Sequence, residues 1–353
     1  MDKTYLARLG LRQKLLREYP DVVRGVNIQS GTPEKNKMIE EALCEWYAFV
    51  MGVYLPGRYP GVFRLVDGSA DGGDEEKGRE KEKETEKRTM LESLVTGLKV
   101  PLDPVELMES SSSSTGTYET KAEDQTQKKK DQLLYLLDTL GTWVDEDFLI
   151  LLPSPSPIKS PDQRETTTTT SEPKSQYHLE AYTTYYPAGF DTRTKLARPL
   201  SEIHGPVPGY KQKLEKSMDR FFEKVDVGRA VVRVNWSVMT PGTGLFAAFG
   251  GLHEHTLEVE EEKGKEEMSV DEVDGKETFL RCERQTLHRL PGSRALLFGF
   301  HTYAYPLEDI KAEGLGEELA VAIDGLKEGN VPEVWQYKRG AYWGEAVKAY
   351  LRS

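Results

Sequence analysis

Cysteine is scarce in this chain of 353 residues, which contains only Cys44 and Cys282. Two cysteines cannot form a disulfide framework, a zinc ribbon or a cysteine-ligated iron–sulfur cluster within the chain. The sequence also lacks the GxSxG, HExxH and CxxC motifs, which leaves hydrolase and zinc-enzyme functions without support. This composition fits a protein of a reducing compartment.

Long apolar runs and excess basic charge are absent as well. No stretch approaches the roughly 18 to 20 apolar residues of a membrane span, and the start, MDKTYLARLG, lacks the pattern of a signal peptide. Acidic residues outnumber basic ones by 59 to 47, giving a formal net charge of −12. This balance argues against electrostatic capture of nucleic acid or of an anionic membrane. We therefore expect a cytoplasmic protein with neither as a partner.

The remaining composition suffices for a core, since 37% of the residues are hydrophobic. Four segments interrupt it, at 68–88, 110–130, 154–175 and 258–277. The first and last are dense in charge and the middle two are rich in Ser and Thr. None can bury an apolar face, so we expect four disordered insertions in one domain spanning residues 1–353. A phosphorylation switch in the Ser and Thr tracts is the alternative.

Three segments, 34–52, 131–140 and 212–225, have the apolar spacing of helices. The side chains that this spacing predicts to face the core are Met38, Ala42, Trp46, Phe49, Leu133, Leu134, Leu137, Leu214, Met218, Phe221, Phe222 and Val225. The third helix follows the proline-rich GPVPGY, which suits a helix start.

Strand patterns follow in the second half of the chain. Residues 229–238 alternate polar and apolar side chains, and 278–288 and 294–303 are joined by LPGS, which suits the turn of an antiparallel hairpin. The side chains of the first strand that are expected to face the core are Val232, Val234, Trp236 and Val238. Helices before and after an antiparallel sheet, without a βαβ rhythm, predict the α+β class.

Two short motifs are weak as sites. The TPGTGLF segment at 240–246 lacks both the GKS/T of a phosphate loop and the third glycine of a dinucleotide fingerprint, so it predicts a hairpin turn. His253 and His255 have the spacing of two metal ligands on a strand. A second ligand pair is missing and an acidic insertion follows, so a solvated loop is favoured.

Charged and polar side chains are dense inside the predicted strands. They are Arg233, Asn235, Arg281, Glu283, Arg284, Gln285, Thr286 and His288. Alternation places Arg281, Glu283 and Gln285 on one face, with Arg284 on the other, so whichever face packs inward buries charge. Two interpretations stay open: a structural Arg/Glu network across the strands, or a polar binding site in the sheet.

At these residues the chain resembles a known family. The resemblance is carried by YLPGRYP (54–60), YYPAGFDTRTKLARPL (185–200), EIHGPVPGYKQKLEKSMDRFF (202–222), RVNWSV (233–238) and RCERQTLHRLPGSRALLFGFHTYAYPL (281–307). Together the ERQTL, IHxPVP and RxNW elements are similar to the DUF3445 family, the α subunits of haem-dependent oxidative N-demethylase, in a form with the long insertions of fungal members. The similarity extends from the N-terminus to about residue 340.

The resemblance implies a PAS-like domain that binds haem b. Such a domain removes a methyl group from a small secondary amine such as dimethylamine, using O2 and two electrons, and releases formaldehyde. In bacterial relatives the electrons come from NADPH through separate flavin and iron–sulfur subunits. This chain has too few cysteines for an iron–sulfur cluster, and it has no dinucleotide motif. A partner protein must therefore supply its electrons. The acidic surface of the chain suits the docking of such a partner. A non-catalytic PAS-like haem or small-ligand sensor is the alternative.

Under this resemblance His204 is the predicted axial ligand of the haem iron, because the prolines of EIHGPVPGY constrain its segment. A helix-capping or packed histidine is the alternative. His288 and His301 are weaker candidates, since the relatives carry Arg at the matching places. Cys282 is weaker too, since they tend to have an aliphatic residue there.

A second group of predicted site residues binds the propionate carboxylates of the haem. Arg233, and one of Arg281 or Arg284, are predicted to pair with the haem propionates, because Arg offers a planar fork to a carboxylate. Asn235 is grouped with these cofactor-binding residues.

Glu283 is the predicted partner of the protonated amine, with Tyr185 and Tyr186 as aromatic walls. The alternative for Glu283 is that it only neutralises neighbouring arginines.

Overall fold

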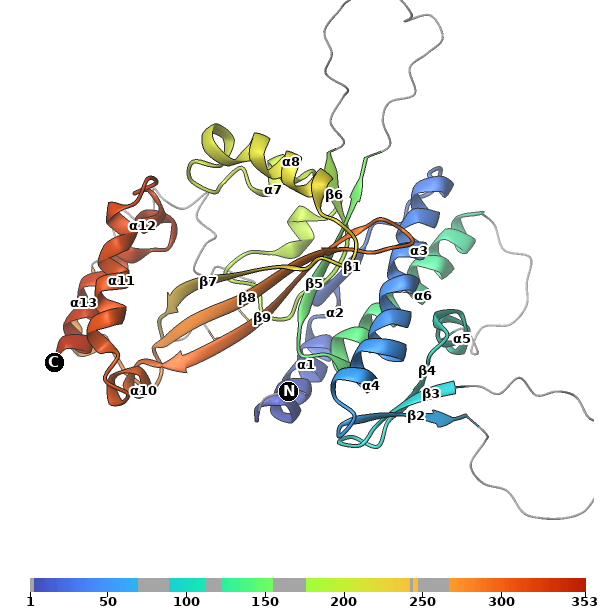
Figure 1. Cartoon of the computed structure of the whole chain (residues 1–353), viewed down its shortest axis with the longest axis horizontal. Coiled ribbons are helices and arrows are strands. Elements are labelled where there is room, and N and C mark those ends of the chain that lie inside the picture. The colour runs from blue at the N-terminus through green and yellow to red at the C-terminus, as the bar shows by residue number, and fades with distance from the viewer. Residues whose placement is uncertain (1–2, 69–88, 112–121, 155–175, 242–243, 247–266) are drawn as a thin grey trace, which may run out of the picture. The chain divides into compact units, whose positions relative to one another are not determined.

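The computed structural model describes residues 3–68, 89–111, 122–154, 176–241, 244–246 and 267–353. The chain divides into two compact units, one of Met1–Leu11 and Ile28–Val144 and one of Arg12–Asn27 and Asp145–Ser353 (Figure 1). Both units combine helices with an antiparallel sheet, so the predicted α+β class is confirmed. None of the described helices is long and apolar enough to cross a membrane.

The first unit consists of helices and a small sheet. Its helices are α3 (Pro33–Phe49), the π-helical turn η1 (Val50–Tyr54), α4 (Leu55–Arg58), α5 (Pro104–Ser110) and α6 (Ala122–Trp143). Its sheet has the order β2-β3-β4, with β2 (Phe63–Asp67), β3 (Thr89–Ser93) and β4 (Lys99–Pro101). Helix α1 (Tyr5–Glu18) begins in this unit and ends in the second.

Helix α3 confirms the predicted helix at 34–52, and Ala42 of the predicted core stripe is fully buried, but the other buried residues differ from those predicted. Ile39, Leu43 and Tyr47 are fully buried, whereas Phe49, predicted to face the core, is 42% exposed. Met38 and Trp46 are only half-buried. The helix carries two adjacent apolar rows, and periodicity alone does not decide which one packs inward.

Parts of two predicted insertions are ordered. Helix α6 starts at Ala122, so residues 122–130 extend the predicted helix instead of forming a loop. Met268 and Val273 are buried in the core of the second unit, because these apolar residues interrupt the acidic run. Most of the other insertion residues, part of the turn at 240–246, and both His253 and His255 lie outside the described residues.

The second unit is built on a six-stranded antiparallel sheet of order β1-β6-β5-β9-β8-β7. Its strands are β1 (Arg24–Val26), β5 (Asp147–Pro153), β6 (Tyr177–Thr183), β7 (Val231–Met239), β8 (Phe279–Arg289) and β9 (Leu296–Pro306). The predicted hairpin is confirmed, since β8 and β9 pair from Phe279–Pro306 to Arg289–Leu296. Strand β7 pairs with β8, but the 240–278 connection between them contains the short helix η5 (Val270–Glu272). TPGTGLF therefore begins the connection between the antiparallel strands β7 and β8, and this connection is much longer than the predicted hairpin turn.

The paired strands place the polar side chains on one face. Arg233 pairs with Gln285 and Asn235 with Glu283, so all four share the face that we call the Glu283 face. Along β8 this face is buried and the opposite one is more exposed. Arg284 therefore lies on the opposite face, as alternation predicts.

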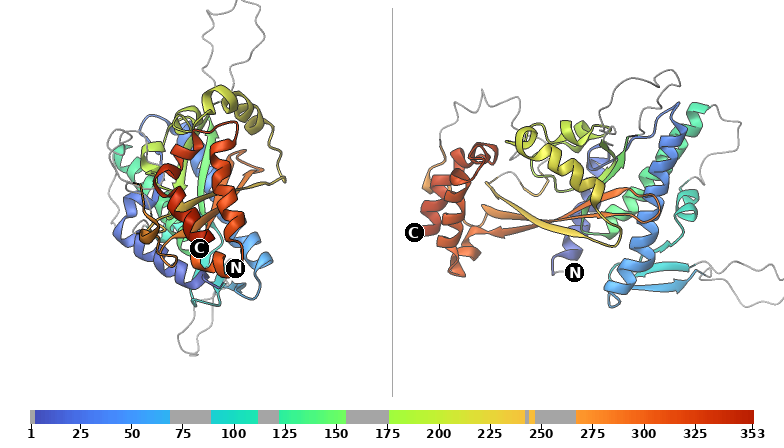
Figure 2. Two further views of the ribbon diagram at one scale, coloured as in Figure 1. Left: turned by 90° about the vertical axis from the view of Figure 1, so that its left-hand side faces the viewer. Right: turned by 45° about the horizontal axis from the view of Figure 1, so that its top comes forward.

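Helices cover each end of this sheet. The second unit contains α2 (Pro20–Val23), the 3-10 helix η3 (Thr192–Lys195), α7 (Leu200–Ile203), the π-helical turn η4 (Tyr210–Leu214), α8 (Glu215–Lys224), α10 (Leu307–Ala312), α11 (Gly316–Glu328), α12 (Val334–Tyr337) and α13 (Gly340–Arg352). Helices α7 and α8 pack with Leu151, Leu179 and Leu287 of the sheet. The C-terminal helices α10 to α13 pack around Val238, at the far end of the long strands (Figure 2).

Some apolar residues of β7 and α8 that were predicted to be buried are exposed, because the helices do not cover the whole sheet. Val232 and Val234 of β7 are 53% and 66% exposed, because β7 is an edge strand and the C-terminal helices reach only its last residues. On α8, Phe222 is buried, whereas Phe221 and the preceding Leu214 are exposed. The apolar pattern thus identified the helix and the strand correctly, but it overestimated how many of their apolar side chains are buried.

Candidate functional site

A buried network of charged and polar side chains lies on the Glu283 face. Arg281 Nε and Nη2 donate to Glu283 Oε1 over 3.1 and 2.9 Å, and Gln285 Nε2 donates to Glu283 Oε2 over 3.0 Å. Arg233 Nε donates to Gln285 Oε1 over 2.6 Å. We call these four residues the Glu283 network. The structural Arg/Glu network, one of the two interpretations of the sequence, is therefore present.

The network is shielded from water at its centre. Arg281 is 1% and Glu283 6% exposed. A buried ion pair is tolerated when its remaining polar atoms are also satisfied. Arg281 Nη2 meets this condition by donating to Thr302 Oγ1 over 3.2 Å and to the Tyr186 carbonyl. Most donors of Arg281 are thus engaged within the chain, which leaves Arg233 as the more available arginine.

Arg233 keeps an open guanidinium fork. Its Nε is bound to Gln285, and its two Nη groups have no hydrogen-bond partner among the described residues. Burial lowers the pKa of Arg233, and the charge of Glu283 opposes this shift. An arginine remains protonated under these conditions, so this fork suits a carboxylate.

His204 is held in one orientation at the end of α7. Its Nδ1 donates to the Leu200 carbonyl over 2.9 Å, and its ring stacks on Tyr210 with centroids 5.1 Å apart. Burial lowers the pKa of His204 below 6.5, the bond to Leu200 opposes this, and the charge of Arg233 adds to the lowering. A neutral ring that donates from Nδ1 carries its lone pair on Nε2, the state required of a metal ligand.

Tyr210 places a second polar group beside His204. The tyrosine is 2% exposed, and its hydroxyl has no hydrogen-bond partner among the described residues. Burial raises the pKa of Tyr210 to about 12, so the hydroxyl keeps its proton. A buried hydroxyl without a partner is uncommon in folded proteins, and it marks this place as one where a bound group would add a contact.

Three other candidates lie on the opposite face of the sheet. Arg284 pairs across the strands with His301, whose Nδ1 contacts the Asp145 carbonyl over 2.5 Å. Alternation along β8 puts His288 on that face as well. The structure therefore brings His204 together with Arg233 and the Glu283 network, and it does not bring Arg284, His288 or His301 to the same place.

Cys282 lies on the face of β8 opposite the Glu283 network. Burial raises the pKa of its thiol, and the nearby charge of Glu283 raises it further. The free thiol is therefore protonated at neutral pH.

Tyr185 and Tyr186 enclose a cation that belongs to the chain. The guanidinium carbon of Arg12 lies 4.0 Å from the ring centroid of Tyr185 and 5.5 Å from that of Tyr186. The backbone N–H groups of both tyrosines donate to Asp147 Oδ2, over 2.9 and 2.7 Å. The role of these rings as walls for an amine stays a prediction. Arg12, fully buried, had no distinguishing signal in the sequence.

Asn235 and Lys338 form a contact that sequence reasoning missed. Lys338, at the end of α12, is 8% exposed, and its Nζ donates to Asn235 Oδ1 over 3.1 Å and to the Trp236 carbonyl. Asn235 is therefore engaged with a lysine that lies about a hundred residues away in the sequence. Only tertiary structure brings these residues together.

The donor set fits a haem better than a bare metal ion. Among the described residues, no group of three or more His, Cys, Asp or Glu is arranged to hold a metal ion. A haem iron needs only an axial donor such as one histidine, since the porphyrin supplies its other nitrogens. The second unit, an α+β domain, contains an oriented neutral histidine and an open arginine fork, two groups of the kind that a haem requires.

Comparison with protein families agrees with this geometry. The family model described as haem-dependent oxidative N-demethylase, alpha subunit-like, matches residues 1–348. The chain therefore belongs to that family, whose name is that of an oxidoreductase. The match extends over both compact units, while the expectation of a single domain stays a prediction.

Proposed function

We propose that this chain is the haem-binding subunit of an oxidative N-demethylase that acts on a small secondary amine of the dimethylamine type. The amine, O2, two electrons and two protons give the primary amine, formaldehyde and water. Family membership supports the reaction class. The observation that carries the proposal is the orientation of His204, whose Nδ1 is bound to the Leu200 carbonyl and whose Nε2 retains the lone pair.

The chain's own residues supply the binding groups for haem b. His204 is the proposed axial ligand, and the Arg233 fork is the proposed partner of a propionate. Arg281 neutralises Glu283 beside it, and the Tyr210 hydroxyl is a further hydrogen-bond donor at this place. When bound, the haem supplies oxygen activation and redox chemistry. The protein holds the group, orients the amine and excludes water.

Glu283 is the proposed carboxylate for the amine, and its surroundings define what it can do. Both of its oxygens already accept hydrogen bonds, from Arg281 and Gln285. These bonds support the alternative role of neutralising arginine as well. The two roles differ in their effects on substitution, because a purely structural carboxylate would not influence amine binding in a variant that remains folded.

The electrons are proposed to come from a separate flavin and iron–sulfur reductase that uses NADPH. The sequence has two cysteines and no dinucleotide motif, so this chain does not carry those cofactors itself. A PAS-like description of the antiparallel sheet and a cytoplasmic location belong to the same proposal.

Turnover tests the proposal. Haem-loaded protein with a surrogate reductant and dimethylamine should consume O2 and release formaldehyde in equal amounts. Haem binding without formaldehyde release would instead identify a sensor. His204→Ala is the matched control, because it should abolish both haem-dependent signals while leaving the fold intact.

A further inference from the structure

Lys338 is a buried cation without a carboxylate partner. It is 8% exposed, and among the described residues its ammonium forms no salt bridge. Its contacts are all neutral: Asn235 Oδ1, the Trp236 carbonyl, and the Trp236 ring, whose centroid lies 5.2 Å from Nζ. A buried charge normally carries a counter-ion, because removing it from water is costly.

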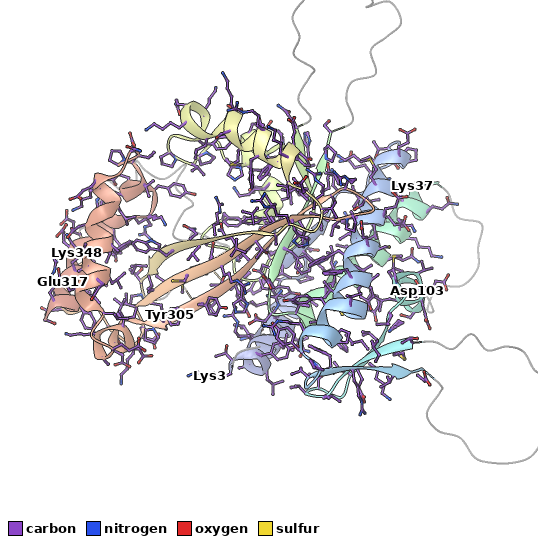
Figure 3. All side chains as sticks on the ribbon, viewed as in Figure 1. Lys3, Lys37, Asp103, Tyr305, Glu317 and Lys348 are labelled. Carbon is purple, nitrogen blue, oxygen red and sulfur yellow. The ribbon has the colours of Figure 1, made fainter. Side chains whose placement is uncertain are left out.

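Lys348 shows the usual arrangement in the same group of helices. It lies on α13 (labelled in Figure 3) and is equally buried, at 7% exposed. Its Nζ bonds to two carboxylates, Asp324 and Glu345, the latter over 2.9 Å. Those bonds raise the pKa of Lys348, whereas burial lowers the pKa of Lys338 to about 8 and the more distant charge of Glu283 only partly opposes it.

The backbone fixes Lys338 in place. Its N–H donates to the Val334 carbonyl, and its carbonyl accepts a hydrogen bond from Trp343 Nε1 over 2.9 Å. The next residue, Arg339, has a φ of 56°, a left-handed conformation that is unfavourable for a side-chain-bearing residue. Strain of this kind persists where the surroundings impose it. The backbone of Lys338 is therefore held in a defined conformation at the end of α12.

Lys338 belongs to a group with surplus positive charge. Asn235, which accepts from Lys338 Nζ over 3.1 Å, lies two residues from Arg233 on the same face of β7 and pairs across the strands with Glu283. Glu283 is already paired with Arg281. Among the described residues, Arg281, Arg233 and Lys338 thus lie around Glu283, and three positive charges beside one negative charge favour negative charge from a ligand.

We infer that Lys338 is a carboxylate-binding residue, which together with the Arg233 fork receives a carboxylate group of a bound ligand. The third N–H of Lys338 is available for this bond, since Asn235 and Trp236 take two. Two sources share this chemistry: a haem propionate, or the carboxylate of an N-methylated amino acid as substrate. The identity of the source rests on the proposed function, whereas the carboxylate site itself does not.

Substitution of Lys338 separates a ligand-binding role from a structural one. Lys338→Met removes the charge at similar length, and the unpaired cation is destabilising, so the melting temperature should stay level or rise. Lys338→Arg retains the charge. Lys327→Met is the matched control, because Lys327 is a lysine over a tryptophan ring in the same helices but has Glu345 as its partner.

The probes distinguish the source of the carboxylate. The apo protein is titrated with glutarate, then with haemin and with haemin dimethyl ester, whose propionates are neutral. The haem-loaded protein is titrated with N,N-dimethylglycine and with dimethylamine. Lys338→Met should weaken glutarate binding at least about tenfold. If the carboxylate is a haem propionate, the substitution should weaken the binding of haemin but not of its dimethyl ester. If the carboxylate belongs to the substrate, it should weaken the binding of N,N-dimethylglycine but not of dimethylamine.

The outcomes also separate this inference from the proposed function. If the parent protein binds no haemin but Lys338→Met still weakens glutarate binding, the carboxylate site is supported and the proposed haem-dependent function is contradicted. If Lys338→Met binds glutarate, haemin and dimethylglycine as the parent does, the inference is overturned while haem binding stands. A fall in the melting temperature of Lys338→Met with unchanged carboxylate binding would assign Lys338 a structural role and overturn it too.

Discussion

Arg12 Nη1 donates to Asp147 Oδ1 over 2.7 Å, with the two side chains 0% and 1% exposed. Asp147 also accepts from the backbone of Tyr185 and Tyr186, so one carboxylate joins α1, β5 and the segment after β6. Asp147→Asn would remove the carboxylate that Arg12 contacts directly and leave the buried guanidinium only the more distant Asp145, whose Oδ1 lies 3.9 Å from Nη1. We expect this substitution to lower the free energy of unfolding by about 3 to 5 kcal/mol, measured by urea denaturation.

The exposed pair of Arg64 and Glu92 provides the comparison for that measurement. The Arg64 side chain is 60% exposed. Glu92→Gln should therefore change the free energy of unfolding by no more than about 1 kcal/mol. Equal losses for Asp147→Asn and Glu92→Gln would contradict the structural role assigned to Asp147.

His204→Ala should remove or shift the Soret band of the haem-loaded protein. One coordination bond is lost, and the core is little affected, so the far-UV circular dichroism should stay native. His178→Ala is the control, since His178 also directs Nδ1 to a backbone carbonyl, that of Gln176, over 3.2 Å. A His204→Ala spectrum that matches the parent would remove His204 as the ligand.

The stability of the apo protein should fall as the pH falls below 6.5. Burial holds the pKa of His204 below that value in the folded chain, so the unfolded chain binds a proton first on acidification. Stability linked to His204 is present above the unfolded pKa and is lost as the pH decreases toward the folded pKa.

Urea titrations at about pH 7.5 and 5.5 test the sign of this effect. The parent should lose more stability between these values than His204→Phe. His288 has a lowered pKa as well, but it is present in both proteins and cancels in the comparison. An equal loss in parent and variant would mean that His204 is not held neutral.

Much of the sheet was predictable because β8 alternates strictly. The two-residue period put Arg281, Glu283 and Gln285 on one face, and the structure shows that this face, which the sequence did not choose over the other, is the buried one. The buried width was less predictable. Val234 has the pattern of a core residue, yet it is 66% exposed on an edge strand, and strand order is not contained in local periodicity.

The site was predictable only where a motif carried it. His204 was predicted as the axial ligand from the EIHGPVPGY segment, and this role stays a prediction. Lys338 has no motif, because its significance depends on burial and on the lack of a salt bridge to any described carboxylate, which are tertiary properties. The tyrosine pair was expected to face a cation, and the cation in the structure is Arg12.

Glu283→Gln should lower the free energy of unfolding by roughly 3 kcal/mol, because Arg281 is left buried without its counter-ion. Glu180→Gln is the control, a buried carboxylate in the same sheet that accepts a bond from the neutral Asn27 side chain over 2.7 Å. Its loss should be smaller, because the Asn27 amide that donates to Glu180 is neutral.

The same variant tests amine binding. At a temperature where Glu283→Gln remains folded and haem-loaded, the spectral change caused by dimethylamine should require at least about tenfold more amine. An unchanged amine titration would confine Glu283 to neutralising arginine.

The most direct test of the central claim is an absorption spectrum of the purified protein titrated with haemin. Haem ligation by His204 predicts a Soret band that saturates at one haem per chain, persists through desalting and is lost in His204→Ala but not in His178→Ala. A spectrum that remains that of free haemin, or a saturable band that is identical in His204→Ala, would contradict it.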